Sequence, residues 1–135
     1  MKYVFRQDLH QPRKIDLRKK LLGKKGEDLA CEFLTKHRYQ IIARNFKARY
    51  GELDIIAVKD DTLVFVEVKT RIGRVFGLPE EAVTTRKLAE VKQTAAYYKL
   101  LHPELPESMQ IDVIAIELDT DETLITFRHI PNVTM

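Results

Sequence analysis

Residues 65–71 read FVEVKTR, which places two charged side chains, Glu67 and Lys69, in an otherwise apolar segment. The run from Leu63 to Val68 is rich in β-branched and aromatic residues, which favour a packed β-strand. A buried charge is costly unless it is paired or holds a metal ion. The two charges therefore need partners, which other parts of the chain must supply.

The segment GELDIIAV (51–58) precedes the turn sequence KDDT (59–62), so 51–58 and 62–70 are predicted to form an antiparallel hairpin. A loop of two or four residues gives a register that places Asp54 directly opposite Glu67, on the face that also carries Lys69. A loop of three residues would put Asp54 on the other face. The site therefore depends on the register of this hairpin.

The opposite face of the hairpin is predicted to be wholly apolar and covered by another element. In this register it carries Ala57 with Val64, Ile55 with Val66, and Leu53 with Val68.

Two carboxylates on opposed residues, with Cβ atoms about 4.5–5.5 Å apart, destabilise a sheet unless their charge is offset. A divalent cation between Asp54 and Glu67 would offset it, since hard cations prefer oxygen ligands. Otherwise one carboxyl must take up a proton. Lys69 could orient an attacking water and stabilise developing negative charge. In the alternative reading, Lys69 forms only a surface ion pair with Glu52, worth under about 1 kcal/mol.

The rest of the chain predicts a layered α/β domain, because helical and strand patterns alternate along it. On the first helix, Ala30, Phe33, Leu34 and His37 form one face, and Glu27 lies at its margin. The predicted order is α-β-β-β-α-β-β. The elements are a helix over 18–37, strands over 40–46, 51–58 and 62–70, a helix over 84–101, and strands over 110–117 and 123–130.

Composition narrows the functional classes. With 135 residues the chain is long enough for one domain with its own core. Its single cysteine excludes an internal disulfide. The absence of a long apolar stretch or a signal-peptide pattern predicts a cytoplasmic protein without a membrane partner. The absence of a Gly-rich phosphate loop argues against a nucleotide cofactor.

The net charge of +3 hides an uneven distribution. Residues 1–26 contain nine Lys or Arg and two Asp, a balance of +7, whereas the rest of the chain is acidic overall. A second basic segment, 36–50, interleaves Lys and Arg with aromatic residues and contains no acid. This clustering favours a nucleic-acid partner, and the alternative for the basic N-terminal segment is a solubilising arm. We expect a basic arm over 1–17 and a single domain over 18–135.

The acidic and basic positions together resemble a known signature. Asp54 followed by Glu67-Val68-Lys69 resembles the D…(D/E)-x-K motif of the restriction-endonuclease-like nuclease superfamily. Three blocks, GKKGEDLACEFL (23–34), RNFKARYGELDIIA (44–57) and LVFVEVKTR (63–71), resemble the YraN-like family. That family is similar to archaeal Holliday-junction resolvases. The resemblance extends from about residue 20 to residue 117 and implies a restriction-endonuclease-like core with a mixed central sheet flanked by helices.

The resemblance also implies catalytic roles. Glu27, Asp54 and Glu67 would face a metal ion, Mg²⁺ or Mn²⁺, with the carbonyl of Val68 as a further ligand. Lys69 would position the attacking water. Gln93 opens QTAAY (93–97), which resembles a Q-x-x-x-Y element of related nucleases and gives Gln93 a place at the same site.

Other basic residues are predicted to contact nucleic-acid phosphates. Lys24 and Lys25 point away from the apolar face of the first helix. At the start of the second helix, positive charge conflicts with the helix dipole unless an anion binds there. The predicted contacts are Lys24, Lys25, Arg44, Arg49, Arg71, Arg74, Arg86 and Lys87.

The sequence thus predicts a metal-dependent endonuclease acting on DNA, in particular on branched or structured DNA. A two-fold dimer would suit a junction with two symmetric cuts. The alternative is a module of the same fold that binds nucleic acid or another partner without catalysis.

Overall fold

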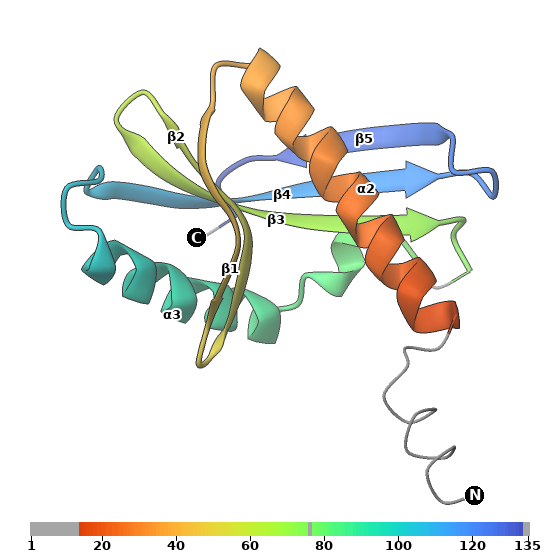
Figure 1. Cartoon of the computed structure of the whole chain (residues 1–135), viewed down its shortest axis with the longest axis horizontal. Coiled ribbons are helices and arrows are strands. Elements are labelled where there is room, and N and C mark those ends of the chain that lie inside the picture. The colour runs from red at the N-terminus through yellow and green to blue at the C-terminus, as the bar shows by residue number, and fades with distance from the viewer. Residues whose placement is uncertain (1–13, 76, 134–135) are drawn as a thin grey trace, which may run out of the picture.

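A computed structural model describes residues 14–75 and 77–133. Two long helices lie on opposite faces of one five-stranded sheet (Figure 1). The predicted order α-β-β-β-α-β-β is confirmed, and it is consistent with a restriction-endonuclease-like core. The elements are α2 (Lys14–Lys36), β1 (Gln40–Ala48), β2 (Gly51–Lys59), β3 (Thr62–Ile72), the 3₁₀ helix η1 (Pro79–Ala82), α3 (Thr85–Leu101), β4 (Ser108–Leu118) and β5 (Leu124–Ile130).

The first helix begins earlier than the sequence predicted. It starts at Lys14, so residues 14–17 of the predicted arm belong to α2, and residues 1–13 lie outside the described part. No helix in the described ranges is long and apolar enough to cross a membrane.

The sheet is mixed, as predicted. Its strands follow the order β1-β2-β3-β4-β5, and only β3 and β4 are parallel. A parallel pair needs a crossover connection, and here η1 and α3 provide it. The crossover carries the start of α3 back across the sheet.

Two apolar layers hold the helices on the sheet. Ala30 and Leu34 of α2 pack on one face, against β-branched residues of the central strands such as Val66 and Ile114. Val91, Ala95 and Tyr98 of α3 pack on the other face. Isoleucine and valine suit both layers because they fit a pleated surface buried on both sides.

A glycine sets the spacing between α2 and β3. A Cβ at Gly26 would overlap Oγ1 of Thr70, whereas a Cβ at Gly23 would meet no atom within 4 Å. Among the described residues, that Thr70 hydroxyl is the one buried polar side-chain atom without a hydrogen-bond partner. The close approach at Gly26 brings the following residue, Glu27, toward the sheet.

The predicted register of the β2–β3 hairpin is confirmed. Its pairs run from Lys59 with Thr62 to Ile55 with Val66. Pairing stops there, so Asp54 is not a ladder partner of Glu67, and the strands separate at this point.

The predicted position of Leu53 is wrong. Leu53 packs on the α3 side of the sheet with Ile56, not on the α2 side with Val68. The alternation of faces therefore breaks at Asp54. Asn45 lies between the pairs Arg44–Ile55 and Phe46–Leu53, opposite Asp54, and has a positive φ of 53°.

Both strands of the β1–β2 hairpin thus depart from regular strand geometry at the same position, Asn45 in β1 and Asp54 in β2. Irregular backbone in paired strands bends them and increases their twist. In Figure 1 the outer half of the hairpin curves away from the plane of β3 and β4. This bend opens the sheet where Asp54 and Glu67 lie.

Candidate active site

Asp54 and Glu67 form a buried pair of carboxyl groups. Their residues are 9% and 3% exposed. Where β2 leaves β3, Oδ2 of Asp54 accepts a hydrogen bond of 2.8 Å from the backbone nitrogen of Val68. A further hydrogen bond links the carboxyl groups of Asp54 and Glu67. The carboxyl pair predicted from the sequence is therefore present, although the two residues are not ladder partners.

Burial governs the protonation of this pair. The pKa of Glu67 is raised from 4.5 to about 8, first by burial and second by the negative charge of Asp54, against the opposing effect of Lys87 and Lys69. Burial also raises the pKa of Asp54, against the opposing effects of the Val68 N–H and Lys69. Without a cation, Glu67 therefore keeps its proton near neutral pH.

Two lysines flank Glu67. The Nζ atoms of Lys69 and Lys87 each lie 3.7 Å from Oε1 of Glu67. Lys69 comes from the same strand, as predicted, whereas Lys87 comes from the first turn of α3. Thr84 caps that turn by accepting a hydrogen bond from the Lys87 backbone nitrogen. Sequence reasoning assigned Lys87 to phosphate binding and missed its proximity to the acidic pair.

Glu27 lies beside the pair, on α2. Burial raises the pKa of Glu27, and the charge of Asp54 raises it further. The neighbouring Asn45 side chain opposes this rise in the pKa of Glu27, and Nη2 of Arg44 lies 3.8 Å from Oε1 of Glu27. Sequence reasoning missed Asn45, because its role arises from a strand irregularity that no local motif marks.

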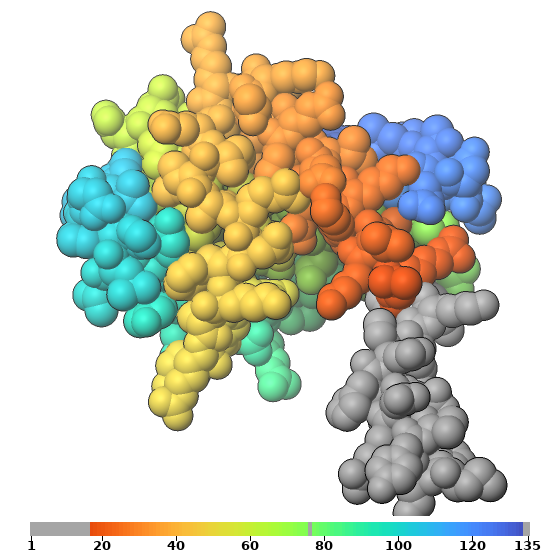
Figure 2. Space-filling model, in the orientation of Figure 1, coloured from red at the N-terminus to blue at the C-terminus, as the bar shows by residue number. Residues whose placement is uncertain are grey.

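A groove of about 670 Å³ extends from Glu27 between α2 and the β1–β2 hairpin. Figure 2 shows this side of the molecule, with α2 in orange and red beside β1 in yellow. The groove is predominantly basic. Its charged and amide side chains are those of Lys19, Lys20, Lys24, Arg44, Lys47, Glu27, Glu52 and Asn45.

The groove brings together two of the predicted phosphate contacts, Lys24 and Arg44. Both also contact Asp28, at 3.0 Å and 2.8 Å. Lys25 instead donates a hydrogen bond to the carbonyl of Glu122. Arg86 is highly exposed and lies 3.8 Å from Glu90.

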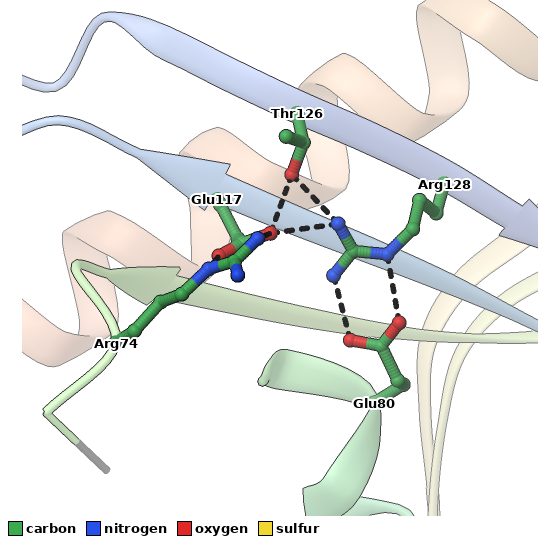
Figure 3. Close-up of polar contacts among 5 residues, drawn as sticks. All are labelled: Arg74, Glu80, Glu117, Thr126 and Arg128. Atoms are coloured by element: carbon green, nitrogen blue, oxygen red, sulfur yellow. Dashed lines mark hydrogen bonds and ion pairs between the residues drawn. The ribbon is translucent and has the colours of Figure 1, made fainter. Parts of the chain in front are cut away.

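Arg74 belongs to a network at the far end of β4 (Figure 3). The buried Glu117 accepts hydrogen bonds from Arg74, Thr126 and Arg128 at 2.7 Å each, and Arg128 also binds both carboxylate oxygens of Glu80 at 2.7 Å. The network ties the segment before α3 to β4 and β5. Arg74 after β3 and Glu80 in η1 are therefore both anchored, while Arg71, at the end of β3, is half-buried.

Gln93 occupies another hollow. It is exposed on α3 and lies with Tyr97, Arg49 and Tyr50 around a cavity of about 350 Å³. This cavity borders the tip of the β1–β2 hairpin and does not include Glu27, Asp54 or Glu67. A role for Gln93 at the acidic pair stays a prediction.

The donor set suits a hard divalent cation with few protein ligands. Among the described residues, no group of three or more His, Cys, Asp or Glu side chains could hold one metal ion. Asp54 and Glu67 alone offer two carboxylates, and Mg²⁺ commonly binds one or two carboxylates and keeps several waters. The high pKa of Glu67 marks a place where positive charge would replace a proton. The residues therefore fit Mg²⁺ or Mn²⁺, with Glu27 at the margin.

These features define a class: a protein with a restriction-endonuclease-like core that carries a buried acidic pair and lysines at the opening of its sheet. Within it, the chain belongs to the uncharacterised protein family UPF0102, the YraN-like group that its motifs predicted, and the match covers residues 26–116.

Curated UPF0102 proteins support this membership. The protein from Syntrophomonas wolfei is 46% identical over 111 residues, which cover 82% of this chain and 95% of the relative. The protein from Geobacter metallireducens is 42% identical over 118 residues, covering 87% and 95%. The protein from Symbiobacterium thermophilum is 45% identical over 103 residues, covering 76% and 87%. Their names state no activity, so a function must be argued from the site.

Proposed function

We propose that this protein is a metal-dependent endonuclease that hydrolyses phosphodiester bonds in DNA, with branched or structured DNA as its substrate. One observation carries the proposal. The buried Asp54–Glu67 pair, flanked by two lysines, lies near the inner end of a basic groove. Carboxylates, lysines and a polyanion-binding surface are what metal-assisted phosphoryl transfer requires.

Asp54 and Glu67 would hold Mg²⁺ or Mn²⁺, with the carbonyl of Val68 as a further ligand. When bound, the cation would polarise the scissile phosphate and lower the pKa of a water. The hydrogen bond from the Val68 nitrogen fixes one oxygen of Asp54, so the other oxygen is held in a defined direction. Such fixed orientation reduces reorganisation during the reaction.

The two lysines carry the remaining chemistry. Lys69 orients the attacking water and Lys87 donates to a phosphate oxygen, so that both counter the negative charge that develops in the transition state. Both ammonium groups lie 3.7 Å from Oε1 of Glu67, so they are at the site before substrate arrives. Partial burial strengthens these interactions, because water screens them less.

The groove would bind the DNA backbone. Lys19, Lys20, Lys24, Arg44 and Lys47 can neutralise phosphates and release bound counterions, so affinity should fall steeply with salt. When DNA binds, Arg44 and Lys24 would give up their contacts with Asp28 and contact phosphate groups instead. A two-fold dimer, which would suit paired cuts in a junction, stays a prediction.

A non-catalytic nucleic-acid-binding module is the second candidate. One observation favours it: a retained proton and two lysines already offset the charge of the acidic pair. The fold therefore requires no cation for its stability.

Cleavage assays separate the two candidates. The protein is incubated with linear, flapped and four-way-junction DNA of matched sequence, in Mg²⁺, Mn²⁺ or chelator. Asp54→Ala and Lys69→Ala test the site, and Asp61→Ala in the exposed β2–β3 turn is the control. Metal-dependent cleavage lost in both site variants and kept in the control supports the nuclease. Cleavage that persists in both site variants refutes it, and binding without cleavage in either metal supports the module.

A further inference from the structure

A second hollow, of about 350 Å³, lies between the tip of the β1–β2 hairpin and α3. A Cβ at Gly51 would lie 3.0 Å from Oγ1 of Thr94, so the hairpin tip packs directly on the helix. The volume falls within the range of roughly 300–1,000 Å³ that is typical of small-ligand sites. The side chains used below are those of Phe46, Lys47, Arg49, Tyr50, Gln93 and Tyr97.

The aromatic side chains of this hollow are exposed. Tyr50 is 58% and Tyr97 48% exposed. The ring of Phe46 lies 6.4 Å from that of Tyr97 and supports it from the sheet side. Exposed, supported aromatic rings offer flat apolar surfaces at little entropic cost, since tyrosine has few rotatable bonds.

The polar groups of the hollow are basic or neutral. Arg49 lies over the ring of Tyr50, with Cζ 5.5 Å from the ring centroid, and Lys47 adds a second positive charge. Gln93 contributes an amide, which can both donate and accept hydrogen bonds. No Asp or Glu is among the described residues that line the hollow. The surroundings therefore suit an anionic ligand with a flat ring.

The hollow lies on the α3 side of the β1–β2 hairpin and the basic groove on its α2 side, and the two meet at one residue of the edge strand β1. Lys47 lines both cavities. The groove extends on its other side to Glu27, which lies beside Asp54. A DNA strand whose phosphates follow the groove would therefore reach the hollow by passing around the edge strand β1 at Lys47.

We propose that this hollow binds an unpaired nucleobase of the DNA strand whose backbone lies in the groove. Tyr97 and Tyr50 stack on the base, Gln93 bonds its edge, and Arg49 contacts the adjoining phosphate. Stacking on aromatic side chains is the common means of holding single-stranded nucleic acid. The inference rests on the proposed function and deepens it: the preferred substrate contains unpaired nucleotides beside a duplex, as at a flap or an open junction.

Another protein segment is the competing occupant, since Leu101 also lines the hollow and Leu100 is exposed nearby. A peptide would use the apolar surface alone. The paired basic residues, the amide and the lack of lining carboxylates favour a nucleotide over a peptide.

The test measures binding without turnover, in chelator and at low salt. Two duplexes of identical sequence are compared, one fully paired and one with a short unpaired flap that carries 2-aminopurine, whose fluorescence falls on stacking. The variants are Tyr97→Ala and Tyr97→Phe. Leu100→Ala is the control, because Leu100 is 78% exposed on the same helix and does not line the hollow. Circular dichroism checks that each variant is folded.

Wild type, Tyr97→Phe and Leu100→Ala should prefer the flapped DNA and quench the 2-aminopurine. Tyr97→Ala should lose about 5- to 100-fold in affinity for the flapped DNA and leave the fluorescence unquenched, while its affinity for the paired duplex stays within about 2-fold. Equal binding of both DNAs by wild type, or an unchanged Tyr97→Ala, overturns the inference but leaves the nuclease proposal standing.

Two further outcomes also overturn the inference. If wild type binds neither DNA at low salt, the proposed function fails and the base-binding hollow fails with it. If Tyr97→Ala keeps its flap preference but lowers self-association in sedimentation, the hollow is instead a contact between copies of this chain.

Discussion

Oδ2 of Asp54 lies 2.8 Å from the backbone nitrogen of Val68 and accepts its hydrogen bond. The β2–β3 ladder ends at Ile55 and Val66, so this side chain serves a backbone group that would otherwise lack a partner at the opening of the sheet. Asp54 therefore has a structural role and a charge, and substitutions can separate the two.

Asp54→Asn should fold like the wild type but lose its response to divalent cations, because the amide oxygen still accepts from Val68 and the charge is gone. Asp54→Ala should also lose about 1–3 kcal/mol of stability, since a buried N–H is left without a partner. Thermal unfolding with and without Mn²⁺ measures both effects, because a ligand that binds only the folded state raises the Tm. If Mn²⁺ raised the Tm of Asp54→Asn as much as that of the wild type, Asp54 would be ruled out as a metal ligand.

Glu67 predicts that the folding stability of the metal-free protein depends on pH. Its pKa is raised from 4.5 to about 8, so the folded state binds the proton more tightly than the unfolded state. This contribution to stability is complete below pH 4.5 and is lost as the pH rises toward about 8. Asp54 shifts in the same direction and adds to the slope.

Glu67→Gln should therefore flatten the decline between pH 5 and 9 and raise the Tm at pH 8–9 by a few degrees, since about 1 kcal/mol corresponds to roughly 4 °C in a domain of this size. Urea unfolding in chelator across this range measures the effect. Glu32→Gln, on the exposed side of α2, should keep the wild-type slope. A Glu67→Gln variant with the wild-type slope would contradict the assignment of the raised pKa.

Lys87 and Arg86 are adjacent in sequence but differ in position. Lys87 lies 3.7 Å from Glu67, whereas the Arg86 side chain is 91% exposed. If the chain cleaves DNA as proposed, Lys87→Ala should lower the single-turnover rate about 10²- to 10³-fold, as expected for losing one donor to the transition state. Arg86→Ala should stay within about 3-fold. Equal effects of the two substitutions would show that both act only through general charge.

Gly26 and Gly23 form a matched pair on α2. The Cβ added by Gly23→Ala would meet no atom within 4 Å, so this substitution should stabilise the helix by about 0.5–1 kcal/mol. The Cβ added by Gly26→Ala would overlap Oγ1 of Thr70, so this substitution should destabilise the protein by about 1–3 kcal/mol. Adding Thr70→Ala to Gly26→Ala should restore most of the loss, because the overlapping hydroxyl is gone. Chemical unfolding ranks the variants, and a harmless Gly26→Ala would contradict the close approach.

Glu117 predicts a loss of stability at low pH, whereas Glu67 predicts a loss of stability at high pH. Hydrogen bonds from Arg74 first, then Thr126 and Arg128, lower the pKa of Glu117 from 4.5 to about 2. Its contribution to stability is present above pH 4.5 and is lost as the pH falls toward about 2. Glu117→Gln should lower the Tm at pH 7 by roughly 5–10 °C and narrow its difference from wild type at pH 3. Glu107→Gln, on the surface, should change little.

The sequence predicted the hairpin register because turn chemistry and apolar alternation both act locally. It did not predict the bend at Asp54, where Leu53 changes face. Asn45 takes a positive φ there, and asparagine tolerates that conformation without any motif to announce it. The acidic pair was thus foreseen by residue type, whereas its carboxylate geometry required the fold.

Charge patterns located basic segments but not their partners. Arg74 contacts Glu117, which is 43 residues further along the chain, and only the parallel pairing of β3 and β4 brings them together. Lys87 reaches Glu67 for a similar reason, because the crossover returns α3 to β3. Contacts between distant segments depend on topology, which local composition does not encode.

The network around Arg128 has a consequence for the order of events during synthesis. Arg128 lies on β5, the last strand, yet it holds Glu80, which precedes the helix that carries Lys87. A nascent chain that has emerged only through β4 has the acidic pair and both lysines but lacks this anchor. We therefore expect a chain that ends after β4 to present its acidic pair and lysines in a looser arrangement than the full chain.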